Sequence, residues 1–419
     1  MIEIFKQLER YNLWSSLKHL PIGYERKGYL KKFQPALGNK LIKVIVGQRR
    51  AGKSYLIRQI IHELIRKGIP PKNTLYLNKE LMEFETINDA KKLHDLITFT
   101  KKKLKTKGKM FVILDEVQNI DGWEKVVSSL AQNPKENYEL IITGSNSTLL
   151  SGELASRLSG RYITFEVLPF SFQEYCDFLN LERGKKSYLS YLSSGGLPEL
   201  FHLTTEEIRR HYVSSLRDTI LLKDIVERYN IKDASLLERV FQFLADNIGN
   251  LSSLNSIVNA LKSSQQRTNH DTVSHYVRSL EQTYLVHEVQ RFDIKGKNIF
   301  SGSKKYYLND LAFRNFLSSR FDEGLGKHLE NSIYLHYRER GYKIFVGSIQ
   351  GAEVDFIIEN EQERKYVQVA YSLAEKRVSE REFRPLENIH DAHEKIVISL
   401  DDVSFGNKEG IKHICAWDL

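Results

Sequence analysis

The sequence predicts an α/β fold built around a doubly wound parallel sheet, and three observations favour it. Five short apolar runs, each about as long as a strand, are separated by segments with helical periodicity. A glycine-rich loop, GQRRAGKS, follows the first run directly, and a pair of acids, Asp115-Glu116, ends the third. Because ligands of such sheets bind at the carboxyl ends of the strands, both motifs would lie on one edge. The runs are residues 41–46, 75–77, 110–114, 140–143 and 162–167.

The glycine-rich loop matches the phosphate-binding pattern G-x-x-x-x-G-K-[ST], and an amphipathic helix is expected directly after it, over residues 55–65. Gly47 and Gly52 allow the backbone to turn tightly and approach a ligand closely. The amides of the loop would point at an anion at the helix N-terminus. Lys53 would reach the β- and γ-phosphates of ATP, and the Ser54 hydroxyl would bind Mg²⁺. The candidate nucleotide-binding residues are Gly47, Gln48, Arg49, Arg50, Ala51, Gly52, Lys53, Ser54 and Tyr55.

A second acidic site is expected at the end of the run MFVIL, whose residues are all apolar, as in a strand that is buried on both faces. Asp115 would hold the water shell of Mg²⁺, and Glu116 would orient and polarise the attacking water. The run 140–143 ends in Gly144-Ser145-Asn146, which would put a polar side chain beside the γ-phosphate. The candidate catalytic residues in these motifs are Lys53, Glu116 and Asn146.

Composition indicates an intracellular protein of several domains. The 419 residues suffice for two to four domains, and a hydrophobic share of 41% with a charged share of 27% is ordinary for a globular chain. The two cysteines, Cys176 and Cys415, provide no disulfide framework. The N-terminus mixes charges and does not resemble a signal peptide, and no apolar run approaches membrane-spanning length. We therefore expect a cytoplasmic protein with no membrane partner.

The chain is basic, with a formal net charge of +9 and a pI near 9.1. Such a charge favours an anionic partner, and double-stranded DNA is the obvious candidate. The densest basic run, KKKLKTKGK at residues 101–109, lies just before the strand 110–114. We interpret it as the solvated end of a helix rather than as a nucleic-acid contact.

Several longer motifs resemble those of AAA-family ATPases of archaea and bacteria that carry a C-terminal winged helix and a restriction-endonuclease-like module. The resemblance covers nearly the whole chain and implies an oligomer, possibly a ring, that binds ATP and Mg²⁺. Its markers are GQRRAGKS, LDEVQNIDGWE (114–124), ITGSNSTLL (142–150), SGRYITFEVLPFSFQEY (159–175), GGLPEL (195–200), KYYLNDLAFRN (305–315), EVDF (353–356) and QVAYSL (368–373).

The resemblance also suggests roles that chemistry alone leaves open. Asn146 or Ser145 is similar to the sensor that detects the γ-phosphate in these proteins. Arg161, in the motif SGRY, is similar to the arginine that they place near a triphosphate, and Arg157 is the competing choice. An arginine finger neutralises charge on the transferring phosphoryl group and is worth about 10³–10⁵ in rate. Whether it acts within its own subunit or on a neighbour stays open from sequence.

Three helices and a hairpin are expected after the ATPase core, as in a winged helix. The helices are residues 236–246, 253–261 and 270–283, with Ser252 or Ser253 and Asn269 as N-caps. Alternating runs at 285–291 and 298–308 surround Lys295-Gly296-Lys297, which is a hairpin signal. The outward face of the third helix and the lysines of the wing would contact DNA. These side chains are Asp271, Thr272, Ser274, His275, Arg278, Lys295, Lys297, Lys304 and Lys305.

The last segment matches the order of metal-binding residues in restriction-type nucleases only in part. Glu330, Asp355 and the strand 366–369 follow one another as those nucleases require, with Glu353 as an extra acid. The third motif departs from the pattern, because Gln368 replaces the acid and Ala370 stands where a lysine is needed. We therefore expect no nuclease activity.

The fold class is thus α/β, with a P-loop NTPase parallel sheet followed by a winged helix and a restriction-endonuclease-like α/β domain. The predicted domains are 1–180 for the ATPase core, 181–234 for a helical lid or linker, 235–310 for the winged helix and 311–419 for the C-terminal domain. Two functions remain open. The first is an oligomeric ATPase that remodels or translocates DNA, and the second is a nucleotide-controlled switch that binds protein partners.

Overall fold

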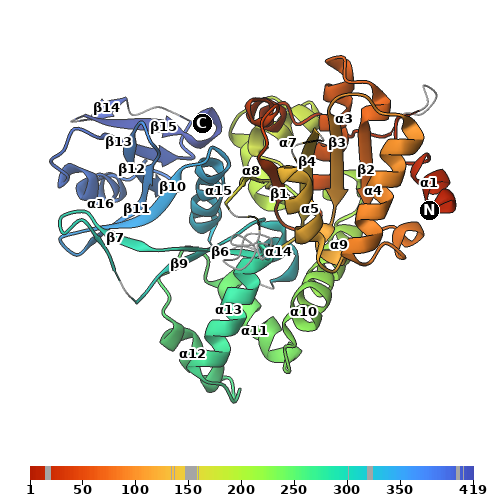
Figure 1. Cartoon of the computed structure of the whole chain (residues 1–419). Helices are drawn as coiled ribbons and strands as arrows, with labels where there is room; N and C mark the ends of the chain where they lie inside the picture. The colour runs from red at the N-terminus through yellow and green to blue at the C-terminus, as the bar shows by residue number, and fades with distance from the viewer. Residues whose placement is uncertain are drawn as a thin grey trace. The chain divides into compact units, whose positions relative to one another are not determined.

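The apolar runs of the first 167 residues form one five-stranded parallel sheet in the computed structural model, with the strand order β2-β3-β4-β1-β5 (Figure 1). This confirms the predicted α/β sheet. Strands β1, β4 and β3 lie next to one another, so the segments that follow them share one edge. The strands are β1 (Ile42–Val46), β2 (Thr74–Asn78), β3 (Met110–Asp115), β4 (Tyr138–Gly144) and β5 (Tyr162–Glu166).

The structure describes the whole chain except residues 15–19, 134, 136, 147–157, 159, 301, 319–323, 403–405 and 409. The described residues divide into two compact units, Met1–Val167 and Leu168–Leu419. Each unit is considered by itself below. Within the described part, no helix is both long and apolar enough to cross a membrane.

Helices cover the sheet of the first unit and close its core. The side chains of Ile45, Ile113 and Ile141, on three neighbouring strands, are fully buried together with apolar residues of α3. The basic run 101–109 overlaps the last turn of α4, as expected for a solvated helix end. The helices are α1 (Ile2–Leu8), α2 (Lys27–Phe33), α3 (Lys53–Arg66), α4 (Ala90–Leu104) and α5 (Trp123–Gln132).

The second unit begins with a run of helices. The three helices expected at residues 236–283 are present as α11 (Ala234–Asp246), α12 (Leu254–Ser263) and α13 (His270–Gln282). Ser253 and Asn269 cap the second and third by accepting backbone hydrogen bonds, which fixes where each begins. The preceding helices are α7 (Phe172–Leu179), α8 (Lys185–Ser194), α9 (Glu206–Thr219), a π-helical stretch (Ile220–Val226) and α10 (Glu227–Tyr229).

The predicted hairpin forms, but its two halves belong to different sheets. Its inner half, β6 (Val286–Val289) with β9 (Lys305–Leu308), is a separate antiparallel pair. Its outer half, β7 (Arg291–Asp293) with β8 (Asn298–Ile299), is the edge of the C-terminal sheet, because β7 pairs in parallel with β10. The hairpin expected to form a wing therefore continues into the next sheet.

The C-terminal sheet is mixed and has eight strands in the order β14-β15-β13-β12-β11-β10-β7-β8 (Figure 1). Strand β11 is antiparallel to both of its neighbours, β10 and β12, whereas β10 runs parallel to β7, and β12, β13 and β15 run parallel to one another. The remaining strands are β10 (Lys343–Ile349), β11 (Ala352–Glu359), β12 (Arg364–Ala370), β13 (Glu394–Ser399), β14 (Asn407–Lys408) and β15 (Ile411–Cys415), and the helices are α14 (Ala312–Leu317), α15 (Leu325–Glu339) and α16 (Lys376–Glu387).

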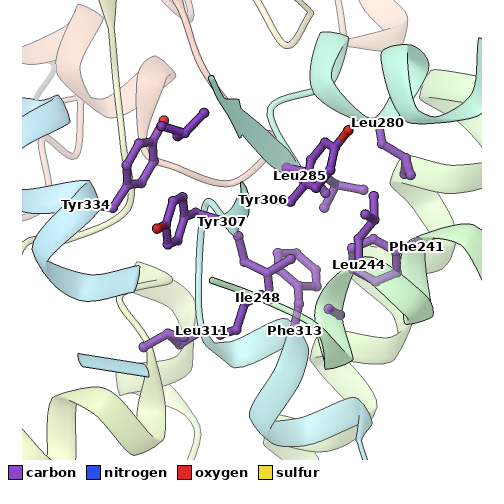
Figure 2. Close-up of a cluster of buried hydrophobic side chains, with 14 of the residues drawn as sticks. Phe241, Leu244, Ile248, Leu280, Leu285, Tyr306, Tyr307, Leu311, Phe313 and Tyr334 are labelled. Carbon is purple, nitrogen blue, oxygen red and sulfur yellow. The ribbon is translucent and has the colours of Figure 1, made fainter. Parts of the chain in front are cut away.

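One apolar core joins the helical part of the second unit to its sheet. Phe241 of α11 meets Phe313 of α14 edge to face, and Tyr307 of β9 stacks on Tyr334 of α15 with ring centroids 4.6 Å apart (Figure 2). Tyr306 and Tyr307 are both buried, although they are adjacent on one strand and point to opposite sides. β9 therefore lies between the three helices and the C-terminal elements.

Candidate nucleotide-binding site

The glycine-rich loop connects β1 to α3 and has the backbone of a phosphate cradle. Gly47 has φ +142° and lies so close to Val167 that an added Cβ would be 2.2 Å from its carbonyl oxygen. Gly52 has φ +100° and stands just before the first residue of α3. Both positions therefore require glycine, and the loop ends at a helix N-terminus, where backbone N–H groups favour an anion.

Lys53 lies inside the loop and beside the candidate catalytic acid. Its Nζ donates to the carbonyl oxygens of Gly47 and Gln48, both at 3.0 Å, and lies 3.7 Å from Oε1 of Glu116. Burial alone would raise the pKa of Glu116, but the positive charge of Lys53 outweighs it and holds the pKa below its usual value. The acid is thus kept ionised, as a group that accepts a proton from water must be.

Asp115 is held in place from two neighbouring strands. The Thr143 hydroxyl on β4 donates to its Oδ1 at 2.5 Å, and the Tyr76 hydroxyl on β2 donates to its Oδ2 at 2.8 Å. Burial raises the pKa of Asp115, and the adjacent Glu116 raises it further, whereas the nearby Ser54 hydroxyl lowers it. The proximity of Ser54 to Asp115 brings together two oxygen donors of the kind that Mg²⁺ prefers.

An amide links Glu116 to the end of β4. Gln118 Nε2 donates to Glu116 Oε2 at 2.5 Å and to Ser145 Oγ at 3.5 Å. Glu116 itself has φ +54°, an uncommon conformation for a residue with a side chain, and its N–H donates to Thr143. Ser145 and Asn146 are fully buried. Because Gly144 lies opposite Val46 in the parallel register, Ser145 and Asn146 lie at the edge of the sheet from which the loop leaves β1.

Arg161 lies at the opposite edge of the same sheet. It precedes β5, and its carbonyl oxygen accepts a hydrogen bond from the N–H of Ile42, the first residue of β1. The loop begins only after Val46, four residues further along, which is about 13 Å of strand. The exposed Arg161 is therefore remote from the loop of its own chain. Its predicted competitor, Arg157, lies outside the described residues.

The remaining loop residues differ in their surroundings. Gln48 and Ala51 are buried, Arg50 is exposed and has φ +67°, and Arg49 forms an ion pair with Glu80 at 2.6 Å. Tyr55 is 47% exposed.

Four polar residues that support this site escaped the sequence analysis. Tyr76 and Thr143 lie within apolar strands, where alternation gives no hint of a partner. Arg26 is buried and donates to the carbonyl oxygen of Ala51 at 3.2 Å, so it helps to fix the backbone of the loop. A buried arginine 21 residues before the loop has no sequence signal of its own. Gln118 could have been noticed, because an amide two residues after an acidic pair can reach back to it.

The lysines expected on the wing fall into two groups. Lys295 and Lys297 are exposed at the turn between β7 and β8, as expected. Lys304 forms an ion pair with Glu288 across the β6–β9 pair. Lys305 was expected to be exposed, but it is only 1% exposed and points among acids of α15 and β11. The expectation that Lys305 contacts DNA is therefore wrong.

The nuclease-like acids do come together. Glu330, Glu353, Asp355 and Gln368 line one cavity of about 1540 Å³. Gln368 Oε1 accepts from the N–H of Asp355 at 3.3 Å, while its Nε2 donates to Glu382 at 2.9 Å.

Comparison with known proteins supports the ATPase fold. A model of an AAA domain matches residues 39–176, and a domain of unknown function (DUF8612) matches residues 185–324. A Walker-type ATPase of Pyrococcus abyssi is similar in structure, with a TM-score of 0.50 and 16% identity over 70% of this chain and 96% of that one. That similarity shows the fold alone.

Two relatives cover nearly the whole chain. An uncharacterized protein of Haemophilus influenzae is 35% identical over 378 residues, which are 89% of this chain and 92% of the relative. An uncharacterized protein of Methanocaldococcus jannaschii is 31% identical over 423 residues, 96% of this chain and 90% of the relative. The chain therefore belongs to the family of these two relatives, and its residues 39–176 form an AAA-type P-loop ATPase domain.

Proposed function

We propose that this protein is an ATPase that hydrolyses ATP to ADP and phosphate with Mg²⁺. The observation that carries the proposal is the convergence of Lys53, Ser54, Asp115 and Glu116 at one edge of a parallel sheet. Catalysis of phosphoryl transfer to water rests on positioning and charge stabilisation, and these four groups can provide both.

The loop residues bind and orient the triphosphate. The Lys53 ammonium, which now bonds to two loop carbonyls, turns to the β- and γ-phosphates when they enter. Glu116 lies 3.7 Å from this ammonium, whose charge holds the acid ionised, so its carboxylate can polarise the attacking water. Glu116 Oε1 accepts the proton of that water, and Gln118 keeps the other oxygen of the carboxylate fixed.

The residues present fit a magnesium ion. Asp115 and Ser54 supply hard oxygen donors, and Thr143 and Tyr76 fix the carboxylate by hydrogen bonds, as second-shell partners of a metal ligand do. When bound, Mg²⁺ would neutralise charge that develops on the phosphate oxygens. Asn146, or Ser145, would then detect the γ-phosphate from the end of β4.

We further propose that Arg161 completes the site of a neighbouring subunit. Its position at the opposite sheet edge, about 13 Å of strand from the loop, supports action in trans over action in its own chain. A side chain that is exposed and at the far edge is available to a second copy. This proposal requires a homo-oligomer, and a ring of copies joined head to tail is one closed form in which every site receives an arginine.

Double-stranded DNA is the partner that we propose for the oligomer, which would remodel or move along it. The exposed Lys295, Lys297 and Arg278, together with the net charge of +9, support the proposal. The alternative, a nucleotide-controlled switch that binds protein partners, is favoured by the loss of Lys304 and Lys305 from the basic surface, since both are paired with carboxylates. Stimulation of ATP hydrolysis by duplex DNA separates the two functions.

Two substitutions test the proposed ATPase. Lys53→Ala should abolish ATP binding, because the β- and γ-phosphates lose their cation. Glu116→Gln should retain ATP binding but stall hydrolysis, because an amide cannot accept the proton of water. Binding of a fluorescent ATP analogue and release of phosphate would be measured on both variants. Hydrolysis at the wild-type rate by Glu116→Gln would show that the catalytic assignment is wrong.

A further inference from the structure

Three carboxylates lie close together in the cavity of the second unit. Glu330 comes from α15, and Glu353 and Asp355 come from β11. The carboxyl group of Asp355 is almost fully buried, and burial, followed by the charge of Glu330, raises its pKa to about 7. Carboxylates this close in a buried place need a positive charge between them. In nucleases with such acids, that charge is a divalent metal ion.

In this chain the positive charge belongs to a lysine from a distant strand. Nζ of Lys305, on β9, lies 2.6 Å from Glu353 Oε1, 2.8 Å from Glu330 Oε1 and 3.5 Å from Asp355 Oδ1. The side chain is 1% exposed, and although burial lowers the pKa of Lys305, the three carboxylates raise it well above its usual value. The ammonium therefore stays charged and contacts all three acids.

Other protein donors also bond to Glu330 and Asp355. Tyr307, two residues along β9, donates to Glu330 Oε1 at 2.7 Å, and Lys327 donates to its Oε2 at 3.0 Å. The N–H of Val369 donates to Asp355 Oδ2 at 2.9 Å. Tyr307 is the residue that stacks on Tyr334 (Figure 2), so this strand is fixed beside the cluster by packing as well as by charge.

We propose that Lys305 is the built-in counter-cation of this acidic cluster, and that the cluster binds no divalent metal while Lys305 is present. An ammonium balances the charge of the acids, but it cannot lower the pKa of a bound water as a metal does.

On this proposal, the ion pairs in the cavity hold structural elements together and do not form a hydrolytic centre. Lys305 ties β9, which follows the three-helix segment, to α15 and β11 of the C-terminal part. On this proposal, the expectation of no nuclease activity depends on the presence of Lys305 and not on the absence of a lysine at Ala370. The acids already have a cation, because the ammonium of Lys305 fills the position that a metal would take.

Manganese binding by the full-length, nucleotide-free protein tests this proposal. Free Mn²⁺ would be followed by electron paramagnetic resonance in the wild type, Lys305→Ala, the matched control Lys304→Ala and the double variant Lys305→Ala with Asp355→Asn. Lys304 is the preceding lysine, and it pairs with Glu288 instead. We expect Lys305→Ala to gain one Mn²⁺ site that the wild type and Lys304→Ala lack, and Asp355→Asn to abolish that gain.

Two results would overturn the proposal. The first is a Lys305→Ala protein that folds, as judged by its circular dichroism spectrum, yet gains no site dependent on Asp355. The second needs no Lys305 variant and applies even if that variant does not fold. It is a wild-type Mn²⁺ site, or Mn²⁺-dependent cleavage of plasmid DNA by the wild type, that is lost in Asp355→Asn. Identical Mn²⁺ titrations of the wild type and Asp355→Asn, without cleavage, would support the lysine as the cation.

Discussion

Replacement of Gln118 by alanine should slow ATP hydrolysis without weakening ATP binding. Gln118 Nε2 donates to Glu116 Oε2 at 2.5 Å, whereas its other bond, to Ser145 Oγ, is long at 3.5 Å. The alanine variant would leave the Glu116 carboxylate free to rotate away from the attacking water. The loop 47–54 loses no contact, because the amide does not bond to it. The effect should therefore fall on kcat rather than on KM.

The expected size follows from the strength of this hydrogen bond. A hydrogen bond to a charged group is worth about 1.5–3 kcal/mol. If all of that orienting energy is lost in the transition state, kcat falls by about 10–150-fold, since each 1.36 kcal/mol is a factor of ten. The smaller figure applies if water takes over part of the amide's role.

A matched glutamine on the same unit provides the control for this measurement. Gln132 lies at the end of α5 and donates to Ser128 Oγ at 2.9 Å on the exposed surface. Steady-state phosphate release would be compared for Gln118→Ala and Gln132→Ala, each alone and in a Glu116→Gln background. Equal kcat values for the two single variants would refute the argument. A full further loss from Gln118→Ala in the Glu116→Gln background would also refute it, because the amide would then act through something other than Glu116.

Three further predictions concern assembly, DNA and pH. Mixed oligomers of inactive Lys53→Ala and inactive Arg161→Ala chains should regain ATPase activity if the arginine acts in trans; permanent inactivity of a verified mixture would contradict this. Removing Lys295 and Lys297 should reduce the salt dependence of DNA binding by about two units of the log–log slope, measured by fluorescence anisotropy, and an unchanged slope would favour the switch. Burial, aided by the charge of a nearby arginine, lowers the pKa of His328 to about 4, whereas its pKa in the unfolded chain is about 6.5. The contribution of the neutral histidine to stability is therefore complete above pH 6.5 and is lost as the pH falls from about 6.5 to about 4. At pH 5 this lowers the free energy of unfolding by about 2 kcal/mol relative to pH 7, and urea unfolding of His328→Gln should show a decrease that is smaller by about this amount.

The sheet and the nucleotide site of the first unit were predictable because their signals are local. A β-branched run, a glycine loop and a lysine at its end form one continuous segment, and the run 110–114 carries its acids directly behind it. The position of Arg161 at the sheet edge opposite the loop could also have been predicted from the sequence. A residue that precedes a parallel strand lies at the other edge from a loop that follows one, whatever the motif around it resembles.

The environment of Lys305 was not predictable, because it depends on contacts 25 to 50 residues away in sequence. In the alternating run KKYYL, either lysine suits an exposed strand edge, and nothing local distinguishes Lys304 from its neighbour. The difference arises only when the hairpin brings β9 against α15 and β11. For the same reason, the missing lysine at Ala370 gave a misleading account of the acidic cluster, although the three acids themselves were identified.

The pairing of β7 with β10 also determines which fragments of this protein can be made. A fragment that ends at residue 310, as a sequence-based domain boundary suggests, would leave β7 and β8 as a hairpin without the strand against which it lies. The backbone groups of β7 would become an open edge, and such edges promote aggregation. The same cut would separate Lys305 from the carboxylates that keep its charge tolerable in a buried place. Expression of residues 168–419 as one piece preserves both features.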